Sequence, residues 1–382
     1  MSIPDMPPLP AADASRLQGL HRRLLDMNHS HVGYPCNQWF DYRHLLPFLD
    51  ISINNVGDPW KGSSFTQNTH EIECEVIRDF AALTQAPAGE YWGYVTNGGT
   101  EGNMYGLYLA RELFPDGVVY FSEDTHYSVP KILRLQHTRN IMIRSLPDGR
   151  MDCEDLRETL RIHRDVPPII FANIGTTMKG AIDDLAAIRT ILEELAIPQH
   201  YIHADAALSG MVLPFMDDPQ PWHFGDGVDS LSISGHKMIG GPLPCGVAMA
   251  RKHHVDRIAR GVEYVGALDT TISGSRNGIT PLILWSAFRQ LGQEGMRERA
   301  RHAVENCRYA VARLQDAGIQ AWCHRNSLTV VFPRPPAEMF RKWIIAPHRK
   351  IGHMITMPHV TRAIIDEFVA DFAASIQPTS TP

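Results

Sequence analysis

Short apolar runs alternate with helical patterns through the middle of the chain, and this alternation constrains the fold more than any other feature. Between the runs lie stretches with apolar residues at helical spacing, such as Leu185, Ile188, Leu192 and Leu195. The order predicts an α/β fold with a mostly parallel sheet that is covered by helices on both faces. The predicted buried strands are 91–96, 118–122, 141–144, 169–174, 201–204, 231–234 and 247–250.

The pattern changes on both sides of this region. Leucines at helical spacing predict an amphipathic helix from about Asp13 to Met27, outside the main lobe and placed to contact a partner subunit. From Gly278 a long helical stretch leads into two strand-like runs, 319–322 and 328–332, and then into a helix around 362–374. We therefore expect an N-terminal helical segment (1–55), a large domain (56–285), a small C-terminal α+β domain (286–376) and a mobile tail (377–382).

Charge and composition exclude several classes of partner. The 382 residues carry a formal net charge of −6, which gives no basic field for nucleic acid or anionic lipid. The six cysteines include no CxxC pair, which favours a reducing compartment. The N-terminus lacks the order of a secretory signal, and no stretch reaches the ~18 apolar residues of a membrane span. We expect a soluble, cytoplasmic protein.

Ionisable residues occur where two of the predicted strands end. Asp205 follows the run 201–204, and Lys237 follows the run 231–234. Ligands of doubly wound sheets bind at the carboxyl ends of the strands. A buried carboxylate and a buried lysine are costly unless a ligand compensates for their desolvation. A cationic ring nitrogen beside Asp205 and an imine on Lys237 would provide that compensation.

Three further segments follow strands and fit the same site. The turn 96–103 (TNGGTEGN) links a strand to a helix, where free N–H groups and a hydroxyl can bind a phosphate. His126, in DTHYS (124–128), is placed to lie flat on an aromatic cofactor, and a structural role is the alternative. The segment 174–177 (IGTT) also ends a strand. All three therefore join Asp205 and Lys237 as candidates for one site.

Together these motifs resemble the group II amino-acid decarboxylases, which use pyridoxal 5'-phosphate (PLP) and have the type I, aspartate aminotransferase-like fold. The resemblance runs from about Tyr34 to Ala374 and is greatest to the bacterial histidine decarboxylase branch. The motifs that carry it are SINN (52–55), WGYVTNGGTEGN (92–103), DTHYS (124–128), FANIGTT (171–177), HADAALSGM (203–211), SGHKMIG (234–240) and GSRNG (274–278).

The resemblance assigns roles to individual residues. It implies that Lys237 carries PLP as a Schiff base, and that Asp205 keeps the pyridine nitrogen protonated so that the ring is an electron sink. His126 is implied to stack on the ring and meet the substrate, with the small Ala207 beneath the other face. Lys237, His126 and Asp205 are thus the catalytic candidates. Gly99, Thr100, Ser234, His236 and, less directly, Arg276 match positions on the phosphate side, and Thr177 matches one near the ring hydroxyl or substrate carboxylate.

The reaction implied is decarboxylation of an L-amino acid to its amine and CO2. An aminotransferase would share Asp205 and Lys237, and is the alternative; it would grip the substrate carboxylate with an arginine such as Arg325 or Arg334. A metal site is not expected, because His203 and Asp205 lack further ligands at a suitable spacing.

Histidine, converted to histamine, is the first choice of substrate. Segments 55–60 and 262–264 also resemble plant serine decarboxylases, and segment 62–69 has Phe65 where the histidine branch has tyrosine. Serine or a branched aliphatic amino acid is the alternative. Active sites of this fold lie at a subunit interface, so the resemblance implies at least a homodimer, or a tetramer.

Overall fold

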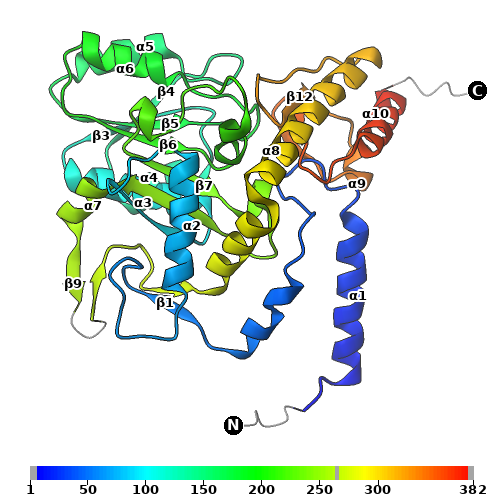
Figure 1. Cartoon of the computed structure of the whole chain (residues 1–382). Helices are drawn as coiled ribbons and strands as arrows, with labels where there is room; N and C mark the ends of the chain where they lie inside the picture. The colour runs from blue at the N-terminus through cyan, green and yellow to red at the C-terminus, as the bar shows by residue number, and fades with distance from the viewer. Residues whose placement is uncertain (1–6, 263–265, 377–382) are drawn as a thin grey trace, which may run out of the picture.

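A seven-stranded sheet forms the centre of the computed structural model, which describes residues 7–262 and 266–376 (Figure 1). Its strand order is β2-β8-β7-β6-β5-β3-β4. The five strands from β7 to β4 are parallel, and β8 is antiparallel to both of its neighbours. All seven predicted strands are present, each within one residue of its predicted ends. The strands are β2 (Tyr91–Thr96), β3 (Val118–Ser122), β4 (Asn140–Ile143), β5 (Pro168–Asn173), β6 (Tyr201–Asp205), β7 (Ser230–Ser234) and β8 (Gly246–Arg251).

Helices cover both faces of this sheet because its inner strands are apolar on both sides. Along β5, Ile170 and Ala172 join one hydrophobic cluster, while Ile169 and Phe171 join the other. The predicted α/β fold with a mostly parallel sheet is thus confirmed. On one face lie α3 (Gly99–Leu113), α4 (Ser128–Leu135) and α7 (Lys252–Ile258); on the other lie α2 (His70–Leu83), α5 (Cys153–Ile162) and α6 (Leu185–Glu194).

A smaller antiparallel sheet follows the long helix α8 (Ile279–Asp316), which is interrupted at Gly292. The predicted strand 319–322 is wrong. The chain turns at Gly318, and only Trp322 forms an isolated bridge, to Val331, before the next turn enters β12. The predicted domain boundary at 285 falls inside α8, so that division stays a prediction. The other elements of this lobe are β12 (Thr329–Pro333), α9 (Met339–Lys342), β13 (Ala346–His348), β14 (Ile351–Ile355) and α10 (Arg362–Ile376).

The N-terminal helix α1 (Ala11–Met27) stands beside the body of the chain, and none of its residues is buried (Figure 1). A 3-10 helix (Arg43–Asp50) follows, and β1 (Asn54–Val56) pairs with β11 (Ser275–Asn277). A second pair joins β9 (Arg260–Val262) to β10 (Ala267–Asp269). Within the described ranges, no helix is both long and apolar enough to span a bilayer. The predicted mobile tail and residues 263–264 of the serine-like segment lie outside the described residues.

Candidate active site

The carboxyl ends of three neighbouring parallel strands meet at one edge of the large sheet. In register, Asn173 of β5 lies beside Asp205 of β6, which lies beside Ser232 of β7. A cavity of about 360 Å³ opens at this edge. Apart from Arg276, the site residues predicted from the sequence all line this cavity, namely Gly99, Thr100, His126, Thr177, Asp205, Ala207, Ser234, His236 and Lys237.

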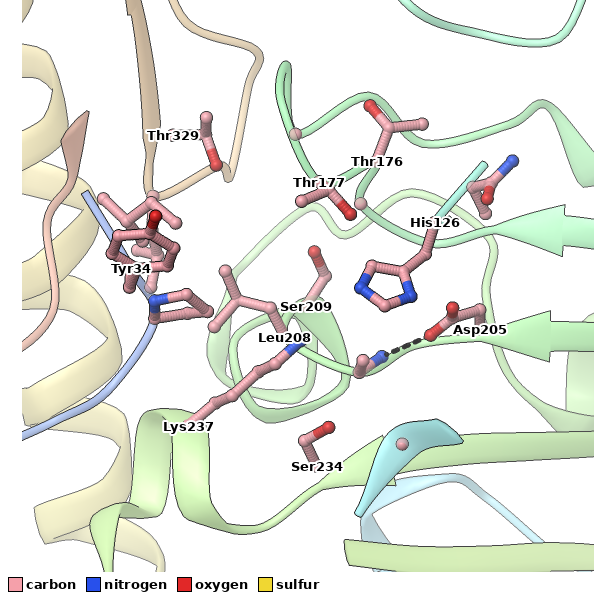
Figure 2. A pocket seen from close by; sticks show the side chains of 18 of the residues that line it. Tyr34, His126, Thr176, Thr177, Asp205, Leu208, Ser209, Ser234, Lys237 and Thr329 are labelled. Carbon is pink, nitrogen blue, oxygen red and sulfur yellow. Dashed lines mark hydrogen bonds between the residues drawn. The ribbon is translucent and has the colours of Figure 1, made fainter. Parts of the chain in front are cut away.

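Lys237 lies in a single π-helical turn (His236–Gly240) directly after β7, and its side chain points into the cavity (Figure 2). The N-terminal segment fixes this turn, because Asn37 N donates to the Lys237 carbonyl at 3.2 Å. Burial lowers the pKa of Lys237, while Asp205 and Cys36 act in the opposite direction. A lysine with a lowered pKa releases its proton more easily, so its amine is better prepared to attack a carbonyl group.

Asp205 ends β6 and is only 8% exposed. Its two oxygens are held separately: Oδ1 accepts from Ala207 N at 3.1 Å, and Oδ2 accepts from Asn103 Nδ2 at 2.8 Å. A carboxylate fixed by two donors is oriented and partly compensated for burial. It can therefore pair with a cationic N–H group of a bound ligand.

His126 lies between Asp205 and Thr177 in the cavity (Figure 2). Its Nδ1 lies 2.7 Å from Ser128 Oγ, which fixes the tilt of the ring. Burial is the largest influence and lowers its pKa; Asp205 opposes this effect, and Lys237 and Lys131 add to it. A neutral imidazole ring held in this way can lie against an aromatic ligand.

The start of α3 provides an anion site. Gly98, at φ 123°, precedes the helix, and the first two residues of α3, Gly99 and Thr100, line the cavity. The first N–H groups of a helix have no partner within the helix and can bind an anion. A Cβ at Gly99 would lie 2.8 Å from Ser234 Oγ, so glycine is needed for this approach. His236 Nδ1 lies 2.7 Å from the Cys245 carbonyl, which leaves Nε2 for a ligand. These donors suit a phosphate group.

Several cavity residues were not predicted from the sequence as site residues. Tyr34, Pro35 and Cys36 come from the N-terminal segment, Asn326 and Ser327 come from the turn before β12, and Thr329 is the first residue of β12. His353 of β14 joins two sides of the cavity, with Nε2 2.8 Å from the Gly33 carbonyl and Nδ1 3.2 Å from the Met178 carbonyl. The one available signal was the polar sequence NSLT (326–329) entering an apolar strand.

Three arginines considered from the sequence lie outside the cavity lining. Arg276 is buried in an ion pair with Glu73 and lies over the Tyr94 ring, so its expected place on the phosphate side is not observed. Arg325 pairs with Asp218 on the surface, and Arg334 donates to the Arg349 carbonyl. The aminotransferase alternative therefore finds neither of its candidate arginines at the site. Phe65 is likewise not part of the lining.

A lysine at a strand end, a fixed carboxylate and an anion site around one cavity fit the amine-reactive aldehyde, ring nitrogen and phosphate of PLP. The model of the pyridoxal-dependent decarboxylase conserved domain matches residues 47–333. The chain therefore belongs to the pyridoxal-dependent decarboxylase family, as the sequence motifs predicted, and PLP is its cofactor.

Individual relatives agree with this assignment. The histidine decarboxylase of Pseudomonas entomophila (strain L48) is 49% identical, over 95% of this chain and 92% of the relative. That of Klebsiella aerogenes is 46% identical, over 96% and 98%. Among solved structures, the L-methionine decarboxylase of Streptomyces sp. 590 has a TM-score of 0.86 at 26% identity, covering 99% of both chains. Such similarity along the whole chain confirms the type I fold and a decarboxylase activity.

Proposed function

We propose that this enzyme decarboxylates L-histidine to histamine and CO2. The carrying observation is that relatives 46–49% identical over nearly the full chain are histidine decarboxylases. The cavity supports a polar substrate, because the hydroxyl-bearing residues Ser209, Thr329 and Thr177 line it. Serine or a branched aliphatic amino acid is the alternative substrate.

The proposed roles follow from the positions of the side chains. Lys237 would hold the cofactor covalently, Asp205 would hold its ring N–H, and His126 would lie against the ring above Ala207. Gly99, Thr100, Ser234 and His236 would hold the phosphate, and Thr177 would lie near the ring hydroxyl of the cofactor or the substrate carboxylate. PLP, when bound, supplies the sink for the electron pair that is left when CO2 departs.

His126 and the cavity walls would then control which bond breaks. Because His126 occupies one side of the cavity, it would limit how the substrate can rotate about its amino nitrogen. The walls would also exclude water from the leaving carboxylate, which favours release of neutral CO2. Lys237, with its lowered pKa, would accept and return a proton at Nζ during the cycle.

We also propose that the enzyme acts in the cytoplasm as a homodimer, or as a tetramer built from such dimers. The support is the exposed apolar surface of α1, where Leu17, Leu24 and Leu25 are each more than half exposed. Surfaces of this kind mark protein interfaces.

The test measures amine and CO2 release from L-histidine, L-serine, L-valine, L-leucine and L-methionine with PLP present. A parallel series contains 2-oxoglutarate. We expect histamine and CO2 from histidine, and loss of at least 10³-fold in turnover in Lys237→Ala, where covalent catalysis is removed. Release of another amine would replace histidine as the substrate, and glutamate formed from 2-oxoglutarate would contradict decarboxylation.

A further inference from the structure

A buried chain of hydrogen bonds runs from the interior of the sheet to Asp205. Ser230 Oγ lies 2.7 Å from His203 Nδ1, His203 Nε2 lies 3.0 Å from Asn103 Oδ1, and Asn103 Nδ2 lies 2.8 Å from Asp205 Oδ2. His203 is 0% exposed, and Asn103 is 2% exposed. Neither His203 nor Ser230 lines the cavity. This chain of hydrogen bonds therefore reaches Asp205 from the interior of the sheet and not from the cavity.

The chemistry of the last link fixes the direction of every bond. The carboxylate of Asp205 can only accept, so the amide nitrogen of Asn103 donates and its Oδ1 faces His203. His203 must then donate from Nε2, which leaves Nδ1 to accept the hydroxyl proton of Ser230. Burial lowers the pKa of His203 to about 4, so the ring stays neutral at physiological pH and keeps this tautomer.

We infer that His203 is a positioning residue, which acts through Asn103 to hold Asp205 as an oriented anion toward the cofactor ring nitrogen. This inference rests on the proposed function of Asp205. Each donor in the chain points toward the carboxylate, and aligned hydrogen bonds strengthen one another in a low-dielectric interior. The amide of Asn103, which would otherwise be free to rotate, is held by His203.

The helix α3 leaves space for this imidazole ring by having a glycine opposite it. A Cβ at Gly106 of α3 would lie 2.1 Å from His203 Nδ1, so only glycine leaves room for the ring there. A fully buried histidine also costs more than an apolar side chain of similar size unless its hydrogen bonds are used. The glycine at position 106 and the buried histidine are both explained if the ring helps to hold Asp205 in position.

The experiment compares His203→Leu with His203→Gln, in which the amide nitrogen can still donate to Asn103. The readouts are the PLP dissociation constant and the pH titration of the visible band of bound PLP. We expect His203→Leu to weaken PLP binding by about tenfold, because Asn103 loses the hydrogen bond that orients its amide and so holds the Asp205 carboxylate less firmly. The titration midpoint should rise by about one pH unit, since less positive charge on the ring nitrogen makes the proton of the lysine–cofactor link harder to remove. His203→Gln should recover most of both effects.

Two further variants separate positioning from folding. Ser230→Ala keeps the imidazole but removes the donor to Nδ1, and should change both readouts in the same direction to a smaller extent. His254→Leu removes another largely buried histidine, which lies 3.2 Å from Asp229 outside the cavity, and should leave both readouts unchanged. Wild-type binding and titration in both His203→Leu and Ser230→Ala would overturn the inference. A wild-type protein that binds no PLP would instead overturn the role of the whole site.

Discussion

Thr329 lines the cavity, and its hydroxyl group has no hydrogen-bond partner in the described part of the chain. The residue is 2% exposed, and its side chain points toward the space between Tyr34 and Thr177 (Figure 2). A substrate that fills the cavity and excludes water from it would leave this hydroxyl unpaired, at a cost in free energy, unless the substrate bonds to it. We expect Thr329→Val, which keeps the shape, to raise KM for the substrate by about fivefold, the equivalent of one hydrogen bond.

Steady-state kinetics and a PLP titration check this prediction together. PLP affinity and the melting temperature should stay at the wild-type value, because valine keeps the shape of the side chain and no hydrogen bond of this hydroxyl to the described residues is lost. Thr190→Val, on the exposed side of α6, is the matched control and should leave KM unchanged. An unchanged KM in Thr329→Val would show that the substrate does not use this hydroxyl.

Only part of the site could be predicted at the level of residues. Asp205 and Lys237 could be predicted because each is an ionisable residue at the end of an apolar run. Such a pattern is unusual, and a few neighbouring positions are enough to recognise it. Apart from the polar sequence NSLT (326–329), nothing in the local sequence marks Thr329 and His353 as cavity residues. They reach the cavity because the small sheet packs against the loop 175–181, where a Cβ at Gly180 would lie 2.3 Å from Ser327 Oγ. That contact joins segments about 150 residues apart and depends on the whole fold.

Helix α3 lies unusually close to the central sheet, and glycines permit this approach. A Cβ at Gly102 would lie 2.2 Å from Ser232 Oγ and 2.8 Å from Ser232 Cβ, and similar contacts occur at Gly99 and Gly106. The three glycines share one helical face. The close packing brings the first N–H groups of α3 to the cavity, so it positions the anion site.

We expect Gly102→Ala to lower the free energy of unfolding by about 1–3 kcal/mol, the usual cost of overpacking a core. Urea unfolding of the protein without PLP measures this directly. Gly295→Ala in α8, where the new Cβ meets Leu291 at an ordinary 3.4 Å, is the control and should be neutral or slightly stabilising. Equal stability of the two variants would mean that α3 can move away from the sheet at little cost.

Elements were easier to predict than their packing. The turn 96–103 was expected to begin a helix and to bind an anion, because its glycines follow an apolar strand. The same glycines gave no indication that they face β6 and β7, since one sequence contains no information on what lies opposite each helical face. The strand expected at 319–322 failed for a related reason: its apolar side chains Ile319 and Ala321 are buried without joining a ladder.

Helix α1 exposes a row of leucines that have no partner among the described residues of the chain. Leu17, Leu20 and Leu24 recur on one side of α1, at exposures of 54%, 39% and 52%, and α1 projects beyond the body of the chain (Figure 1). An isolated helix of this length is marginally stable in water. Packing against a second copy would bury these leucines and stabilise the helix, which agrees with the proposed homodimer.

Leu24→Glu should therefore dissociate the oligomer, since it places a charge where the leucine would be buried. Size-exclusion chromatography with light scattering should show a species of half the wild-type dimer mass, and turnover should fall at least tenfold if the subunit contact completes the site. Ser15→Glu introduces the same side chain on the opposite side of α1 and should keep both mass and turnover. If Leu24→Glu kept the wild-type mass, α1 would not hold the subunits together. If Ser15→Glu also dissociated, the effect would come from charge and not from the apolar face.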